Sequence, residues 1–394
     1  MAYLMKLSGL MLAGLAGGAC VEAEESTPTP GNVYVWAGIS ERGFNIENPT
    51  AHRLKSKFYF PIDLTFDQTD RAYILDWNNH LIRRAEPNGS LVTVVGTDYE
   101  GDGSPEMEDR LPVCNPAGAI GTTVAMNHMT DVELGPDGKL YIATWHNNKI
   151  RVFDPATNVV TALAGDGHGF TGDGGPACSA LFDTPKAVAI APDNTVYTID
   201  QRNVRIRKIQ PDAARTITTI AGTGTVGDVG DGGPALEAQF GFEIGPTPRP
   251  TGALVLSGRV MYVADSLNNR IRRIDLDTGL VDCIAGQAQP GYSGDGGQAL
   301  QAQFDFPMDI ELGPDGRLYV ADRNNHAVRA IDLTTGIIET VVGDGTRCDA
   351  SRESCADRPA RETRLNEPYG IAFDNAGSLY IADSHNHRIL KVAR

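Results

Sequence analysis

The chain is poor in positive charge and in long apolar runs. It carries 34 Lys and Arg against 50 Asp and Glu, a formal net charge of -16 at pH 7, and its basic residues form no block. A protein of this sign repels a phosphate backbone, so no nucleic acid partner is expected. The motifs of hydrolases and nucleotide-binding proteins are also missing: there is no Gly-x-Ser-x-Gly elbow, zinc-protease helix or phosphate loop. Nucleophilic hydrolase chemistry therefore has no support in the sequence.

One apolar stretch, from Leu7 to Leu15, stands near the start of the chain and is too short to span a bilayer. Lys6 precedes it and small residues lead from it to Cys20, so residues 1–20 are predicted to be a secretory signal peptide. The small residues before Cys20 resemble a bacterial lipobox, in which this cysteine is lipidated; the alternative is an ordinary cleaved signal. Residues 21–31 are then a short tether. We expect an exported protein, held at the cell envelope by its lipid anchor only. By analogy with Gram-negative sorting, Val21 indicates the outer membrane.

Six copies of one pattern fill the rest of the chain. Each copy has a Tyr, two small or β-branched residues, usually an Asp, an Asn-containing turn and a basic alternating strand. The copies begin at Tyr73, Tyr141, Tyr197, Tyr262, Tyr319 and Tyr380. With 44 Gly and 23 Pro scattered along the chain, turns are frequent and long helices are not expected.

Each copy predicts four short strands joined by tight turns, which is the pattern of a propeller blade. The sixth copy stops at Arg394 after its third strand, whereas residues 33–38 resemble the fourth strands of the other copies. We therefore predict an all-β, six-bladed β-propeller over residues 32–394. Its N-terminal strand completes the last blade and closes the ring.

The unit resembles the NHL repeat, in an exported bacterial form that carries Gly-Asp-Gly-Gly-Pro-Ala before a blade, as in Gly172–Ala177 and Gly230–Ala235. The resemblance implies a propeller whose loop face carries the function, and such propellers include enzymes, receptors and scaffolds. The first hypothesis is a monomeric interaction module for a protein, peptide or glycan. The alternative is a metal-dependent enzyme at the channel mouth, such as a lyase of the peptidyl-hydroxyglycine type or a lactonase-like hydrolase. The sequence leaves open whether the chain is an enzyme.

Candidate metal ligands are the residues expected to converge near the channel mouth. They are His52, His128, Asp63, Asp131 and Asp309. Imidazoles would suit Zn²⁺ and carboxylates Ca²⁺, although the Asp residues could instead bind neighbouring backbone N–H groups. His80, His326 and His387 share one repeat position and are predicted to be turn residues. The histidines of the turns between second and third strands are expected to point away from one another.

Other repeated side chains are predicted to have structural roles. Asp265 and its counterparts should accept backbone N–H groups of the turn that follows. Arg272 and its counterparts should pair with turn carboxylates. Asp102, Asp173, Asp231 and Asp295 of the Gly-rich segments could cap turns or hold Ca²⁺.

Cysteine use fits an oxidising compartment. Cys348 and Cys355 lie in one insertion between blades and are predicted to form a disulfide. Cys114 and Cys178 are a second, weaker candidate pair, which leaves Cys283 as a buried thiol.

Overall fold

The structure of the protein is a computed structural model that describes residues 29–45, 48, 50–97, 99–103 and 111–394. The predicted signal peptide and the lipidation site Cys20 lie outside these residues. No helix in the described ranges is long and apolar enough to cross a membrane.

Six antiparallel sheets make up the fold, and each is one blade. Blade one contains β2 (Pro61–Phe66), β3 (Ala72–Asp76), β4 (Leu81–Ala85) and β5 (Leu91–Val95). Blade two contains β7 (Met129–Leu134), β8 (Leu140–Thr144), β9 (Lys149–Asp154) and β10 (Val159–Ala164), with β6 (Ala119–Ile120) at its outer edge. Blade three contains β11 (Pro185–Ile190), β12 (Val196–Asp200), β13 (Arg205–Ile209) and β14 (Ile217–Ala221).

The second half of the ring repeats this order. Blade four contains β16 (Ala253–Ser257), β17 (Val260–Asp265), β18 (Arg270–Asp275) and β19 (Leu280–Ala285), with β15 (Gly233–Pro234) outside it. Blade five contains β20 (Pro307–Leu312), β21 (Arg317–Asp322), β22 (Ala327–Asp332) and β23 (Ile338–Val342). Helical structure in the described residues consists of three-residue 3₁₀ turns, at η1 (Arg53–Lys55), η2 (Trp77–Asn79), η4 (Gly121–Thr123), η5 (Ala177–Ser179), η6 (Ala235–Glu237), η7 (Ser266–Asn268), η8 (Ala299–Gln301), η9 (Arg323–Asn325), η10 (Ala360–Glu362) and η11 (Ser384–Asn386).

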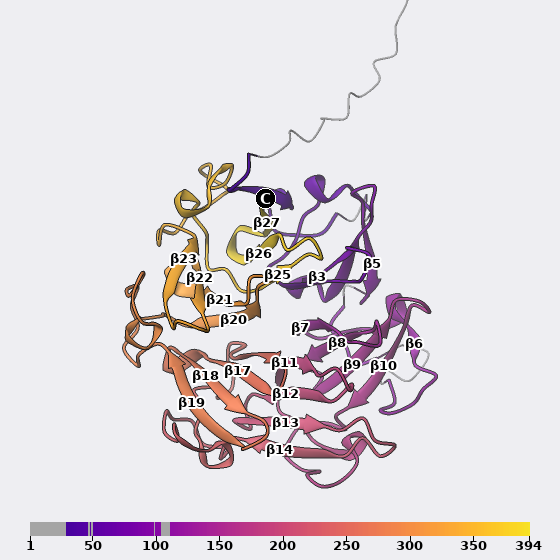
Figure 1. Ribbon diagram of the computed structural model, residues 1–394. Coiled ribbons are helices and arrows are strands. Elements are labelled where there is room, and N and C mark those ends of the chain that lie inside the picture. The colour runs from indigo at the N-terminus through magenta and orange to yellow at the C-terminus, as the bar shows by residue number, and fades with distance from the viewer. Residues whose placement is uncertain (1–28, 46–47, 49, 98, 104–110) are drawn as a thin grey trace, which may run out of the picture.

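The sixth blade is built from both ends of the chain. β25 (Ile371–Phe373), β26 (Leu379–Asp383) and β27 (Arg388–Val392) are followed in the sheet by β1 (Asn32–Ala37), which pairs antiparallel with β27. This confirms the predicted closure of the ring by the N-terminal strand. The short β24 (Arg358–Pro359) pairs with the other edge of β1, so β1 is not the outermost strand. In Figure 1 the indigo N-terminal strand lies beside the yellow C-terminal strands.

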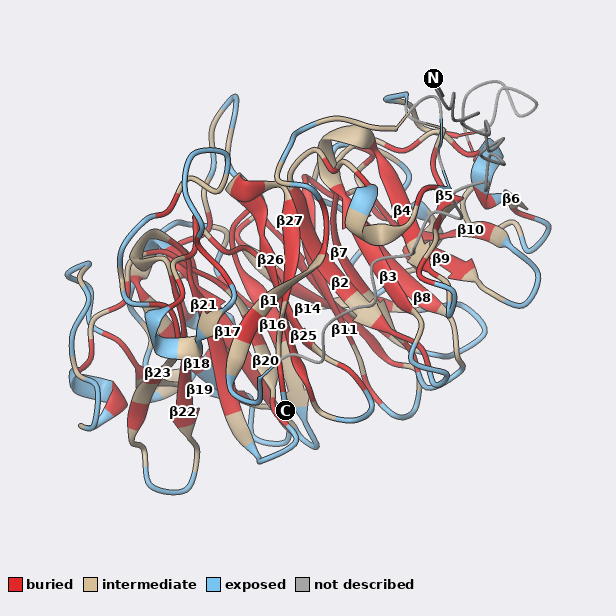
Figure 2. Ribbon diagram, turned by 90° about the horizontal axis from the view of Figure 1, so that it is seen from above, coloured by how far each residue is buried: buried red, intermediate tan, exposed pale blue. Residues whose placement is uncertain are grey.

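Blades pack face to face around a common axis (Figure 1). The innermost strands β2, β7, β11, β16, β20 and β25 contact one another in turn. The packed faces are apolar; for example, Ile150 of blade two and Val188 of blade three belong to one buried cluster. Figure 2 shows buried strands through the body of the ring and exposed loops along its rims. The fold thus leaves turns and connections as its main solvent-facing surface.

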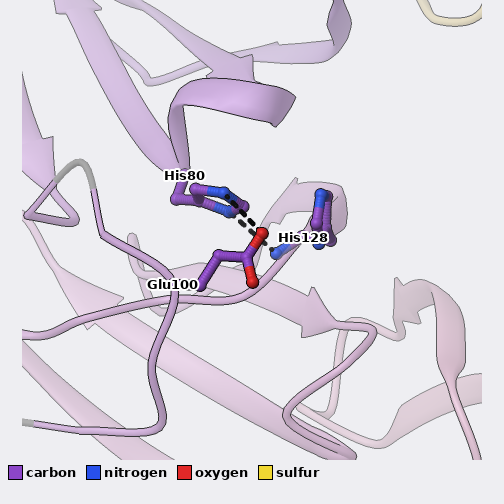
Figure 3. Close-up of side chains that lie close together, drawn as sticks. All are labelled: His80, Glu100 and His128. Carbon is purple, nitrogen blue, oxygen red and sulfur yellow. Dashed lines mark hydrogen bonds and ion pairs between the residues drawn. The ribbon is translucent and has the colours of Figure 1, made fainter.

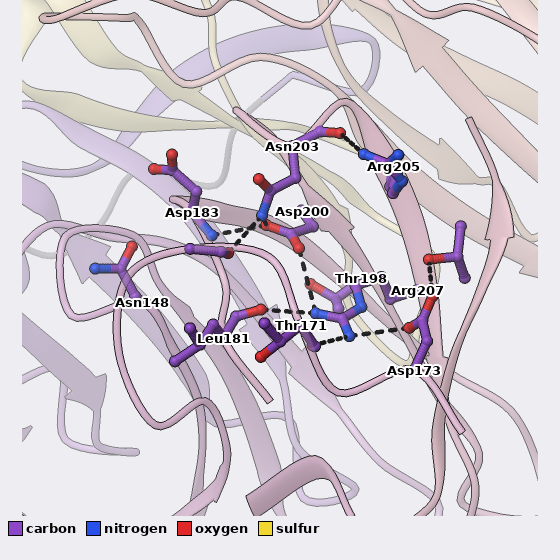
Figure 4. Close-up of polar contacts among 12 residues, drawn as sticks. Asn148, Thr171, Asp173, Leu181, Asp183, Thr198, Asp200, Asn203, Arg205 and Arg207 are labelled. Carbon is purple, nitrogen blue, oxygen red and sulfur yellow. Dashed lines mark hydrogen bonds and ion pairs between the residues drawn. The ribbon is translucent and has the colours of Figure 1, made fainter. Parts of the chain in front are cut away.

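Each blade is held by a buried acid–base network, which Figure 4 shows for blade three. Asp200 accepts the backbone N–H of Asp183 and the side-chain amide of Asn203, each at 2.8 Å. The buried Arg207 pairs with Asp200 at 3.4 Å and with Asp173 at 3.0 Å. Asp200 therefore binds the connection that precedes its blade, not the backbone of the turn that follows. The expectation for these Asp residues was wrong in that respect.

The Asp residues of the Gly-rich segments take part in the same network. Asp102, Asp173, Asp231 and Asp295 pair with the fully buried Arg151, Arg207, Arg272 and Arg329, respectively. A buried guanidinium needs a carboxylate partner. These Asp residues are therefore counterions of buried arginines, which supports their structural role.

Two disulfides tie connections between blades. Cys348 and Cys355 are bonded as predicted, and Cys114 and Cys178 form the second bridge. Cys283 is the free cysteine of the described residues.

Candidate binding site at the mouth of the ring

Five of the six innermost strands are preceded by a residue with positive φ whose backbone N–H is hydrogen-bonded to the previous blade, a contact that we call the latch. The residue before or near the strand donates its backbone N–H to the residue that ends the second-to-third-strand turn of that blade. The latched pairs are Phe60 with His387, His128 with His80, Thr184 with Asn148, Phe306 with Asn269 and Glu367 with His326. Between blades three and four the turn residue is Val204, which has no acceptor, and Gln201 accepts the N–H of Thr251 instead.

The turn histidines His80, His326 and His387 are left-handed, as predicted for turn residues. Their Nδ1 atoms accept the latch hydrogen bonds, so in the neutral ring the proton is on Nε2. Burial lowers the pKa of all three imidazoles below 6.5, which favours this neutral state.

At the face of the propeller that carries the second-to-third-strand turns, these segments bring large side chains of all six blades into one continuous ring of contacts around the axis. We call it the mouth ring. The contacts run from Gln201 through Trp145, His146, His128, Trp77, Phe60, Tyr369, Arg323, Phe306 and Arg249, and the ring closes where the side-chain amide of Gln201 donates to the backbone carbonyl of Arg249.

In the half of the mouth ring formed by blades one, two and six, the contacts are between aromatic rings. The ring of Phe60 lies 5.1 Å from that of Tyr369 and 5.8 Å from that of Trp77, and Trp77 lies 4.7 Å from His128. Phe60, Trp77 and His128 are half-buried and His146 is exposed. Aromatic faces and polar ring atoms thus remain open to solvent at the mouth.

In the opposite half of the mouth ring, arginine side chains lie over aromatic rings in cation–π contacts. Arg249 lies 4.4 Å from the ring centre of Phe306, and Arg323 lies 4.9 Å from that of Tyr369. Arg249 also pairs with Glu243 at 2.7 Å, and Arg323 pairs with Glu367. The hydrogen bond from His385 and the charge of Arg323 lower the pKa of Glu367 to about 2, so this carboxylate stays ionised. The arginine half therefore offers charged groups whose orientation is fixed by neighbours.

Below the mouth ring, a small cavity on the axis is lined by Asp63, Asp131, Asp309 and Lys186. Each carboxylate bonds backbone of the next blade: Asp63 binds Val132 N–H at 2.8 Å, Asp131 binds Val188 N–H, and Asp309 binds Ile371 N–H at 2.8 Å. Burial raises the pKa of all three, and repulsion from Asp131 and Asp309 adds to the rise at Asp63. These carboxylates therefore link neighbouring blades by hydrogen bonds.

The five residues predicted as metal ligands do not meet at one point. The three Asp residues line the axial cavity, whereas His128 lies in the mouth ring. His52 caps η1, where its Nδ1 accepts the N–H of Leu54, and it lines a separate pocket with Trp36 and Arg53. For His52 and the three Asp residues the divergence follows from hydrogen bonding, because their acceptor atoms bind nearby backbone N–H groups.

A cluster that sequence reasoning missed surrounds His128. His80 and His146 pack against it at 4.6 and 4.9 Å between ring centres, so the expectation that turn histidines point away from one another was wrong here. Ligand atoms of His80, Glu100 and His128 lie within 4.8 Å of one another (Figure 3). The available signal was positional: a histidine occurs in two adjacent turns and in the connection between them.

Comparison with known proteins agrees with this architecture. The NHL repeat family model matches residues 304–331 and 365–392. The chain is 26% identical over 283 residues to Protein SUPPRESSOR OF QUENCHING 1, chloroplastic, of Arabidopsis thaliana, which covers 67% of this chain and 24% of that protein. It is 24% identical over 364 residues to NHL repeat-containing protein 2 of Homo sapiens, which covers 85% of this chain and 46% of that protein. The chain thus spans less than half the length of these relatives.

Solved structures share the fold. A protein of unknown function from Bacteroides thetaiotaomicron superposes with a TM-score of 0.61 at 17% identity, over 92% of this chain and 75% of that one. An auxiliary nutrient binding protein of the same organism superposes with a TM-score of 0.59 at 16% identity, over 91% and 75%. The fold is that of a six-bladed β-propeller. Two of its repeats, in blades five and six, match the NHL repeat.

Proposed function

We propose that the protein is a binding module that holds a protein, peptide or glycan on its loop face, at the mouth ring. The supporting observation is that aromatic, imidazole and guanidinium groups from five blades, together with the amide of Gln201 from blade three, form one continuous rim there. Tyr, Trp and Arg are the side chains that contribute most at binding interfaces, because they combine apolar area with hydrogen-bond donors.

Several groups at the mouth are suited to a ligand. The buried indole N–H of Trp77 has no hydrogen-bond partner among the described residues. Beside it the half-buried Phe60 supplies an aromatic surface. Across the mouth, the side chain of Arg249 is 49% exposed although its orientation is fixed by Glu243. A preorganised rim of this kind loses little side-chain freedom on binding.

The carboxylates of the axial cavity favour binding over catalysis. Asp63, Asp131 and Asp309 each accept backbone N–H groups, a role in holding blades together. The metal-dependent enzyme considered from the sequence would need such carboxylates as free ligands or bases.

We further propose that binding takes place at the cell envelope, on an exported chain anchored by lipid at Cys20. The support is the signal-like N-terminus together with two disulfides, which persist in oxidising compartments.

The test compares two arginines of blade four. The soluble chain from residue 21 onward is applied to immobilised collections of glycans and peptides. Arg249→Ala removes a mouth-ring cation and should weaken binding by about tenfold or more. Arg259→Ala is the matched control: its side chain is 58% exposed and pairs with Asp277 at 2.9 Å, but it lies in the strand turn on the opposite face. Equal loss in both variants, or no loss with Arg249→Ala, contradicts a site at the mouth ring.

A further inference from the structure

Three donor atoms at the border of blades one and two lie unusually close together. Nδ1 of His128 is 3.0 Å from Nδ1 of His146. The side-chain oxygen of Asn127 is 2.8 Å from the first nitrogen and 3.3 Å from the second. Two imidazole nitrogens and one amide oxygen therefore form a nearly equilateral triangle.

We infer that Asn127, His128 and His146 form a binding site for a divalent transition-metal ion such as Zn²⁺. A triangle with these sides has a circumradius of about 1.8 Å, so a point about 2.0 to 2.1 Å from all three atoms exists beside its plane. That distance is the usual bond length of Zn²⁺ to imidazole nitrogen and to oxygen. Imidazole ligands also suit Cu²⁺ and Ni²⁺, so the ion class is defined by the donors.

Proton positions in the triangle favour a cation. Two N–H groups cannot point at each other across 3.0 Å, so if both histidines carried the proton on Nδ1, both N–H groups would have to share the oxygen of Asn127. A metal ion uses both nitrogen lone pairs and the amide oxygen at once. Neutral imidazole is the form that binds a metal ion, and each ring has an Nδ1 atom at the triangle.

The backbone holds the two ligand segments side by side. Trp145 donates its N–H to the carbonyl of His128 at 3.1 Å, and His146 donates to the carbonyl of Asn127 at 3.3 Å. The His146 ring stacks on Trp145 with 4.3 Å between ring centres. Binding an ion therefore requires little ordering of the chain.

His80 is not a ligand of this site. Its Nδ1 accepts the N–H of His128 at 3.3 Å, so the proton of the neutral ring lies on Nε2, 3.5 Å from Glu100 (Figure 3). A metal ion on Nε2 would break the latch between blades one and two. His80 thus positions His128, and Glu100 supplies negative charge near the ion.

The experiment uses tag-free protein, stripped with a chelator and titrated with Zn²⁺ by calorimetry, with bound metal counted by elemental analysis. One ion per chain is expected. His146→Ala should lower the affinity for Zn²⁺ at least about tenfold, because one of two imidazole ligands is lost. His385→Ala is the matched control, since His385 holds the same repeat position in blade six. His80→Asn should keep binding, because Asn148 and Asn269 make the same latch in other blades.

Circular dichroism and a Co²⁺ titration, read by visible absorption, make the outcome decisive. Folded His146→Ala protein that lacks the Co²⁺ bands of the wild type supports the site. The inference is overturned if the wild type binds no Zn²⁺, if His146→Ala and His385→Ala lose affinity equally, or if His80→Asn alone abolishes binding. The site shares His128 and His146 with the mouth ring, but the titration uses Zn²⁺ or Co²⁺ alone, so its result does not depend on whether the mouth ring binds a glycan or peptide.

Discussion

The carboxylates that line the axis make the stability of the ring depend on pH, and Glu311 is the sharpest test. Burial, followed by repulsion from Asp309 and Asp131, raises the pKa of Glu311 from 4.5 to about 8. Burial also raises the pKa of Asp309 to about 7 and that of Glu133 well above its usual range. In the folded protein these groups therefore hold protons that the unfolded chain releases near pH 4.

The sign follows from proton linkage. A raised pKa in the folded state means that the free energy of unfolding falls as pH rises from about 4.5 to about 8, and then levels off. The raised pKa of Glu311 alone lowers the free energy of unfolding by less than about 1 kcal/mol at pH 5 and by about 5 kcal/mol at pH 9. Glu311→Gln removes the charge but weakens the hydrogen bond from the N–H of Leu312, which costs about 1 kcal/mol. The variant should be about 2 to 4 kcal/mol more stable than the wild type at pH 9, and should match it within about 1 kcal/mol at pH 5.

Urea unfolding followed by tryptophan fluorescence at the two pH values measures this difference. Glu339→Gln on β23 is the control, because Glu339 pairs at the surface with Arg317 and Arg361. It should change stability by less than about 1 kcal/mol at either pH. A Glu311→Gln variant that is less stable than the wild type at pH 9 would refute the assignment of Glu311 as a half-buried carboxylate that destabilises the fold when ionised.

Three further predictions concern the closure and cohesion of the ring. Removing residues 29–37 deletes β1 and exposes the edge of β27, so the whole propeller should melt at lower temperature in one transition; an unchanged Tm would contradict closure by β1. Replacing both Cys114 and Cys178 by Ser opens a loop with a sequence separation of 64 and should lower the free energy of unfolding by up to about 4 kcal/mol, with a lower urea midpoint; an unchanged midpoint would exclude a bridge. Arg207→Met leaves the buried Asp200 without its cation and should lower the free energy of unfolding, measured in urea, by about 3 to 5 kcal/mol. An unchanged free energy of unfolding would contradict this role of the pair.

The repeat itself made most of the fold predictable. Six copies of the Tyr pattern specify six blades, and the unmatched strand at residues 33–38 specifies how the ring closes. The left-handed turn position of His80 could be predicted because Asn occurs there in other copies. Blade two has Thr144 where the other blades have an Asp. The backbone N–H of Asn127, in the connection before this blade, therefore donates to the side chain of Asn147 instead.

The site was harder to predict, because it depends on contacts between blades. Sequence period fixes which residues share a repeat position, but not which side chain of one blade meets that of the next. His128 and His146 converge because a latched backbone turns His128 toward blade two, an orientation that depends on its φ of 49°. Likewise, the pairing of Asp173 with Arg207 joins residues 34 positions apart, which no local pattern reveals.

The most direct test of the central claim is hydrogen–deuterium exchange on the protein with and without a ligand selected from the glycan and peptide collections. We predict that the ligand slows exchange in the connections and turns that carry Phe60, Trp77, His128 and Arg249. The opposite-face turn at Arg259 should exchange at the same rate with and without ligand. Protection confined to the opposite face, with none around the mouth ring, would contradict the account.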